Sequence, residues 1–164
     1  MRMDSLKKML GVMMAAMVLA AASPASAAQD KPADNMQILR DKIRADKKLV
    51  VATNMELTES EAKAFWPIYD QYQKDLQKIN HRIVSLLESY ADDYRNKSLT
   101  DDKAKKLINE AVAIDRAEGD LKTVYAPKLS KVLPAIKVVR YLQIENKIRA
   151  LVRYDIASGV PLIR

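Results

Sequence analysis

The longest regular pattern of apolar residues in the chain has helical spacing. Apolar side chains recur at alternating steps of four and three residues, at Phe65, Tyr69, Tyr72, Leu76, Ile79, Ile83, Leu86 and Tyr90, and Tyr94 continues the row. This heptad spacing predicts a long helix that packs against another helix at a shallow angle. Thr58 and Glu61 precede the row with the spacing of a capping box, which predicts where the helix begins.

A second helical pattern begins after Thr100, which is suited to cap a helix whose first residues are Asp101 and Asp102. Its apolar stripe extends to Val132 or Leu133 and contains Ala104, Leu107, Ala111, Ile114, Ala117, Leu121, Val124 and Tyr125. The small residues of this stripe match the large residues of the first row. We therefore expect the two helices to form an antiparallel hairpin with closely spaced backbones.

A shorter helix is predicted on each side of this hairpin. The first runs from about Asn35 to Asn54, although its segment 49–51 also fits an extended conformation. The last takes Pro134 as its first residue and ends at Gly159, and its apolar face holds Val138, Tyr141, Leu142, Ile148, Val152 and Ile156. The predicted fold is all-α: a long antiparallel helical hairpin with a short N-terminal helix and a fourth, C-terminal helix, in one domain over 35–164.

The N-terminus has the pattern of a cleavable signal peptide. Arg2, Lys7 and Lys8 precede an uncharged apolar run of 14 residues, 9–22, and small residues follow at Ala25 and Ala27. The run is shorter than the roughly 20 residues that span a bilayer, so we expect no stable membrane insertion. We expect cleavage after Ala27, with Ala28 nearly as good a site, a flexible leader over 28–34, and export to the periplasm.

Removal of residues 1–27 changes the composition of the chain. Six of the eight methionines leave with this segment, and the formal net charge falls from +7 to +5. Basic and acidic residues are interspersed in the remainder, so no dense basic arm points to nucleic acid. The sequence contains no cysteine, which excludes disulfide bonds and thiolate chemistry.

Few residues in the chain are typical of catalysis or of metal binding. His81 is the only histidine, and no Glu-x-x-His pair of a di-iron bundle occurs, so we predict no metal ligand and no cofactor. Asp115, Glu118 and Glu145 lie on or near apolar stripes, where ion pairs are a better explanation than acid–base catalysis. No nucleophile elbow or phosphate loop is present. We therefore predict no catalytic residue and no enzyme activity.

Two predicted helix starts share a motif. Leu57 and Thr58 precede the first long helix, and Leu99 and Thr100 precede the second, 42 residues later. An exported all-α chain with paired Leu-Thr helix starts resembles the Spy/CpxP family of periplasmic stress proteins, marked by repeated Leu-Thr-x-x-Gln motifs. Glu61 and Lys103 stand at the Gln positions here.

The resemblance implies a function in protein binding. It implies a curved dimer of helical hairpins that binds unfolded proteins without ATP during envelope stress. A regulatory or sensory module that docks on an envelope partner is the alternative, and a metal-binding stress protein is a third possibility, which the scarcity of ligands disfavours.

The candidate client-binding residues are one aromatic and several basic side chains. Trp66 points about 100° away from Phe65 around the helix, so it packs on the first helix or forms an exposed contact. Basic residues at helical spacing form rows that are either solvated faces or client contacts. The full candidate set is Trp66, Lys74, Lys78, Arg82, Lys137 and Arg140.

Overall fold

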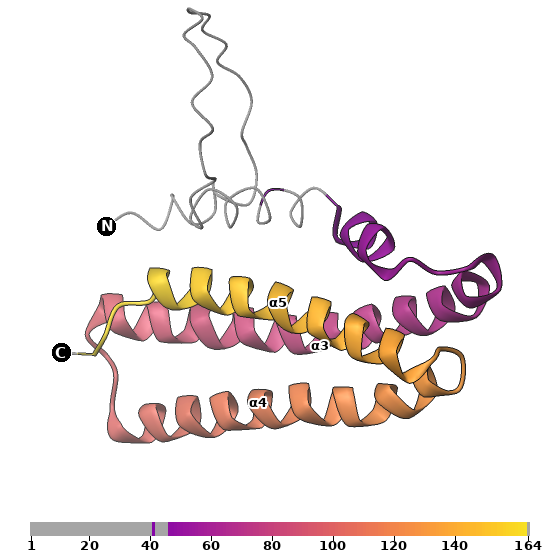
Figure 1. Cartoon of the computed structure of the whole chain (residues 1–164). Helices are drawn as coiled ribbons and strands as arrows, with labels where there is room; N and C mark the ends of the chain where they lie inside the picture. The colour runs from indigo at the N-terminus through magenta and orange to yellow at the C-terminus, as the bar shows by residue number, and fades with distance from the viewer. Residues whose placement is uncertain (1–40, 42–45, 164) are drawn as a thin grey trace, which may run out of the picture. The chain divides into compact units, whose positions relative to one another are not determined.

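The computed structural model describes residue 41 and residues 46–163, which belong to one compact unit, Met36–Arg164 (Figure 1). The predicted signal peptide and leader lie outside the described residues. Residues 46–55 are helical, and three longer helices follow: α3 (Glu59–Asn96), α4 (Asp101–Ser130) and α5 (Ala135–Gly159). No strand occurs among the described residues, and the predicted all-α fold is confirmed. The extended alternative for 49–51 is wrong, because these residues are helical.

The predicted capping box starts α3. The Thr58 hydroxyl accepts a hydrogen bond from the Glu61 N–H at 3.3 Å, and the Glu61 carboxylate accepts one from the Thr58 N–H at 2.8 Å. At its other end α3 stops at Lys97, which has a left-handed backbone with φ 50° and donates its N–H to Asp93 and Tyr94. Local sequence therefore determines both ends of the longest helix.

The boundary between α4 and α5 differs from the prediction. The α4 helix ends at Ser130 rather than Val132 or Leu133, and the Val132 N–H turns back to Leu129 O at 3.0 Å. Pro134 caps α5 and is not its first residue. A proline disfavours helical backbone at the residue before it, so α4 cannot continue through Leu133 into α5.

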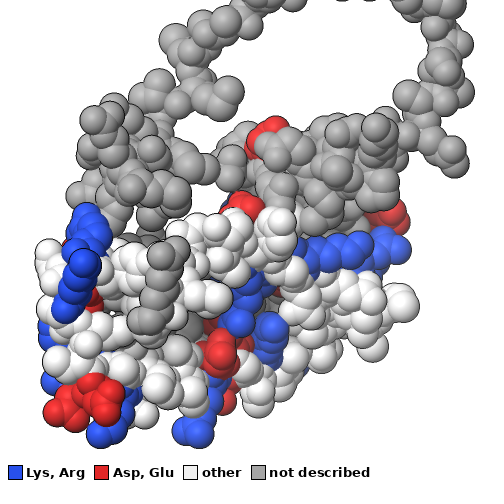
Figure 2. Space-filling view, turned by 90° about the vertical axis from the view of Figure 1, so that its left-hand side faces the viewer, with Lys and Arg blue, Asp and Glu red and all other residues white. Residues whose placement is uncertain are grey.

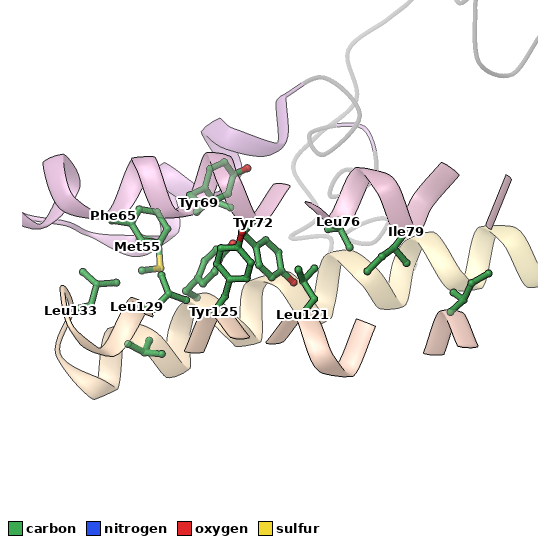
Figure 3. Close-up of a cluster of buried hydrophobic side chains, with 14 residues drawn as sticks. Met55, Phe65, Tyr69, Tyr72, Leu76, Ile79, Leu121, Tyr125, Leu129 and Leu133 are labelled. Atoms are coloured by element: carbon green, nitrogen blue, oxygen red, sulfur yellow. The ribbon is translucent and has the colours of Figure 1, made fainter. Parts of the chain in front are cut away.

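The core is an aromatic cluster at the end of the bundle where α3 begins (Figure 3). Phe65 and Tyr141 meet edge to face with ring centroids 5.2 Å apart, and Tyr72 and Tyr125 do so at 5.3 Å. This geometry places the positive edge of one ring against the negative face of the next. Met55, fully buried, reaches the same cluster from the helix over 46–55.

The three long helices are not equally spaced. The α3 and α4 helices form the predicted antiparallel hairpin, with Cα atoms closer than 8 Å, whereas no Cα atom of α5 comes that near to α3. The α5 helix runs alongside the hairpin and ends near the α3–α4 turn (Figure 1). Tyrosine rings and long polar side chains therefore fill the wider space between α3 and α5.

We expect the two helix caps to contribute unequally to stability. Thr58→Ala should lower the free energy of unfolding by about 1 kcal/mol, because it removes half of a reciprocal cap. Thr100→Ala should cost less, since Thr100 makes a single long hydrogen bond of 3.4 Å to the Lys103 N–H. Urea unfolding followed by circular dichroism measures both, and equal costs would contradict this ranking.

Candidate protein-binding surface

A buried carboxylate ties α5 to its neighbours. Glu145 is fully buried, and its two oxygens accept hydrogen bonds of 2.8 Å from Lys47 Nζ and from Gln73 Nε2. Burial lowers the pKa of Lys47, although the negative charge of Glu145 opposes that shift. The sequence predicted an ion pair here, with Arg149, Lys147 or a residue of a neighbouring helix as the partner, and the structure has the last of these, Lys47.

One turn further along α5, a buried arginine attaches this helix to α3 and α4. Arg149 is buried, pairs with Glu118 of α4 and donates Nη1 to Asn80 Oδ1 of α3 at 2.8 Å. Arg153 also reaches Glu118, at 2.8 Å, and Asp115 at 2.7 Å. Asp115 and Glu118 thus serve as ion-pair partners, which the sequence favoured over catalysis.

A third polar contact joins α3 to α4. The Tyr125 hydroxyl donates to Asp75 at 2.6 Å, and Lys78 Nζ lies 2.8 Å from the same carboxylate. Lys78 and Tyr125 together hold the pKa of Asp75 well below its usual range. Burial, together with Asp75, raises the pKa of Tyr125 to about 12.

The other half of the hairpin lacks a closed core. Between Asn80 and Ala113 no residue is fully buried, although this segment continues the apolar seam of α3. Its apolar side chains are half-buried or exposed, and Ile108 is 61 % exposed. We call residues 80–113 the open end. Its half-buried and exposed apolar side chains include Ile83, Val84, Leu86, Leu87, Tyr90, Tyr94, Leu99, Leu107, Ile108 and Val112.

The C-terminal segment adds apolar surface at the open end. The Tyr90 hydroxyl donates to Pro161 O at 2.6 Å, which fixes the backbone of this segment beside α3. The side chains beyond that point face solvent, since Leu162 is 86 % and Ile163 63 % exposed. The contact with α3 is therefore made by the backbone of this segment and not by its apolar side chains.

Charges at the open end are balanced. Figure 2 looks onto this side of the bundle, where uncharged surface separates scattered basic and acidic residues. Arg82 pairs with Glu110 at 2.8 Å and Lys103 with Asp93 at 2.5 Å. The segment carries six basic residues, Arg82, Arg95, Lys97, Lys103, Lys105 and Lys106, and six acidic ones, Glu88, Asp92, Asp93, Asp101, Asp102 and Glu110. Apolar contact is therefore the main attraction that this surface offers.

The predicted client-binding residues do not form one surface. Lys137 binds Glu61 at 2.6 Å and Arg140 lies 3.1 Å from Glu56, so both lie where α3 begins. Arg82 lies in the open end, paired with Glu110. These basic side chains are already engaged within the chain, and their role in client binding stays a prediction.

The remaining candidates differ in exposure. Trp66 is half-buried, with its ring 5.0 Å from that of Phe65 and Lys48 Nζ 5.1 Å above it. Of the two placements predicted for Trp66, the structure has packing against the first helix. Lys78 pairs with Asp75, whereas Lys74 is exposed and makes no ion pair with the described part of the chain.

The exposed apolar residues of α4 were missed by the sequence reasoning. Ile108 and Val112 lie off the predicted stripe, spaced by one helical turn on the outer face. That off-stripe pair was the available signal, because an isolated hairpin helix needs only one apolar stripe. Ile83, Leu86 and Tyr90 were in turn expected as seam residues, and they are only partly covered.

The described residues contain no cluster of three or more His, Cys, Asp or Glu side chains that could hold a metal ion, and His81 is exposed. Within the same ranges no helix is both long and apolar enough to cross a membrane. No family model, curated protein or solved structure matches the chain.

The buried pair between Lys47 and Glu145 should show strong coupling. Lys47→Met should cost about 3 kcal/mol of stability, because it leaves a buried carboxylate without its cation. Adding Glu145→Gln should restore most of that loss, since the neutral amide still accepts from Gln73. Urea unfolding of both single variants and the double variant gives the coupling free energy.

The matched control is the exposed pair between Lys48 and Asp70, whose Nζ and Oδ1 atoms are 2.6 Å apart. Lys48→Met and Asp70→Asn should couple by less than about 1 kcal/mol, because solvent screens them. If the two pairs couple equally, burial of Glu145 has no energetic consequence and our interpretation is wrong.

The low pKa of Asp75 predicts an acid-dependent contribution to stability. The folded state holds the carboxylate more tightly ionised than the unfolded state, so its contribution is complete above the unfolded pKa of about 4. It is lost as the pH falls towards the folded value. The stability difference between the wild type and Asp75→Asn should therefore be constant from about pH 7 to 5 and shrink by pH 3.

Thermal unfolding across this pH range measures the effect. Tyr125→Phe removes one of the hydrogen bonds to Asp75 and should leave a smaller acid-dependent difference. A difference between wild type and Asp75→Asn that is the same at every pH would contradict the shifted pKa.

Proposed function

We propose that the chain is a periplasmic, Spy/CpxP-like stress protein that binds other proteins as an ATP-independent chaperone. The single observation that carries the proposal is the open end, where apolar side chains of α3, α4 and the C-terminal segment remain uncovered. Contiguous exposed apolar surface on a small protein is typical of an interaction site. The predicted signal peptide supports the location, and the Leu-Thr helix starts at Leu57 and Leu99 support the family.

The chemistry of the open end suits partly unfolded clients. Unfolded chains expose apolar segments, and burial of such segments needs no directional geometry. Balanced charge on the protein side neither selects nor repels clients of either sign. We further propose that two copies pair, because a thin hairpin buries little apolar surface by itself.

A regulatory module that docks on one envelope partner is the second candidate. The observation that favours it is that the exposed apolar residues of the open end lie beside a C-terminal segment fixed by the hydrogen bond between Tyr90 and Pro161. A defined patch of this kind suits a single partner. A general chaperone binds many unrelated unfolded proteins, so the number of clients separates the two functions.

Substitutions at the open end should weaken the proposed chaperone activity. Ile108→Ser combined with Val112→Ser should reduce several-fold the suppression of aggregation of unrelated, thermally unfolded proteins, measured by light scattering. Both positions are exposed, so the variant should remain folded. If the wild-type chain protects none of these proteins, the chaperone proposal fails and the regulatory alternative takes its place.

The matched control lies on the first turns of α5. Ile136 and Val139 are 72 % and 50 % exposed, and the same two serine substitutions there should leave protection intact. The salt dependence of client binding distinguishes binding through the apolar surface from binding through the rows of basic residues. Binding that persists at high salt supports the open end, whereas loss of binding would point to the predicted basic residues, including Lys74 and Arg82.

A further inference from the structure

The helix over residues 46–55 packs against both α3 and α5, and we call the surface that receives it the groove. Val51 and Met55 are fully buried, and Lys47 sits four residues before Val51. All three side chains therefore lie on one helical face. That face meets Glu145 of α5 and the aromatic residues at the start of α3. Burial of Val51 and Met55 against this groove stabilises the helix, since most helical stability in proteins comes from packing of an apolar face.

The groove is selective for such a helix. Glu145 is fully buried, so any occupant has to bring a cation to its carboxylate, as Lys47 does at 2.8 Å. The same occupant has to place apolar side chains one and two turns later, as Val51 and Met55 do. Every copy of this chain carries a segment that satisfies these requirements.

The connection from this helix to α3 is short and strained. It consists of residues 56–58, and Glu56 has φ 48°, in the left-handed region that a non-glycine residue adopts at a cost. Two contacts from α5 hold it there. Lys137 Nζ donates to Glu56 O at 2.9 Å, and Arg140 lies 3.1 Å from the Glu56 carboxylate.

We propose that two copies of the chain pair by exchanging this helix, so that residues 46–55 of one copy occupy the groove of the other. The exchange keeps every contact of Lys47, Val51 and Met55 while releasing Glu56 from its strained conformation. Three extended residues span about 10 Å, so the ends of the two bundles where α3 begins would meet. Exchange of an identical element through a strained connection is a low-cost route to a dimer.

This inference rests on the proposed pairing of two copies. It adds that the two copies exchange the helix over residues 46–55. It is independent of client binding, because it places the shared contact at the opposite end of α3 from the open end. Any other occupant would need the same spacing of one cation and two apolar residues.

Single-cysteine variants of this cysteine-free chain test the exchange. Lys48 of this helix and Asp70 of α3 form an ion pair with exposed side chains. Lys48→Cys and Asp70→Cys chains, unfolded together and refolded at high concentration, are treated with a short bismaleimide crosslinker. A covalent heterodimer is expected, because these two positions from different copies meet only after exchange. Lys48→Cys mixed with Lys105→Cys, in the first turns of α4, is the control for random collision.

Two substitutions at one position then test the strained connection. Glu56→Gly removes the steric penalty in the closed chain and should lower the heterodimer yield several-fold. Glu56→Val, which loses the same carboxylate and tolerates the left-handed region poorly, should raise the yield. Circular dichroism confirms that both variants are folded.

The outcomes are separated by light scattering coupled to size-exclusion chromatography. A dimer whose heterodimer yield matches the control overturns the exchange but leaves pairing through another surface. A monomer at every concentration overturns both the exchange and the pairing, without bearing on the aggregation assay.

Discussion

The fully buried carboxylate of Glu145 constrains how the remaining elements of the bundle are placed. A buried charge is tolerated only with partners of the correct geometry, and these come from two different elements, Lys47 and Gln73. The requirement fixes the helix over 46–55 and the rotation of α5 at once. Tyr141, one turn before Glu145, is thereby turned into the aromatic core, where burial raises its pKa.

This constraint produces a bundle with two unlike ends. Where α3 begins, large rings fill the space that the wide separation of α3 and α5 leaves. Towards the α3–α4 turn, α5 is attached through Arg149 and Arg153 to Glu118 and Asp115, and the side chains there are partly covered. Stability is thus concentrated at one end, while the other end keeps apolar side chains that are half-buried or exposed.

Much of the fold could be predicted because it depends on local rules. The capping box at Thr58 and Glu61 and the end of α5 at Gly159 follow from hydrogen-bonding and backbone preferences of a few neighbouring residues. The errors were local as well. The apolar pattern of Val132 and Leu133 predicted that α4 would extend to them, whereas it ends at Ser130 and the chain turns before Pro134.

The candidate site was harder to predict, because exposure depends on what covers a residue. Phe65 and Tyr69 are buried. Ile83, Leu86 and Tyr90 continue the same heptad spacing, yet they are only partly covered. The role of the rows of basic residues was difficult to predict for the same reason. Lys137 and Arg140 match a binding face by spacing, but their partners are seventy or more positions earlier in the chain, at Glu61 and Glu56.

Periodicity, near neighbours and composition were sufficient to predict the long helices, the capping box at Thr58, the antiparallel hairpin and the absence of cysteine chemistry. Three features could be found only in the folded protein: Lys47 neutralises Glu145, Trp66 lies under Lys48, and residues 80–113 lack a closed core. These features arise from contacts between residues distant in the chain. Periodicity shows which face of a helix is apolar, and the packing of the other helices determines whether that face is covered.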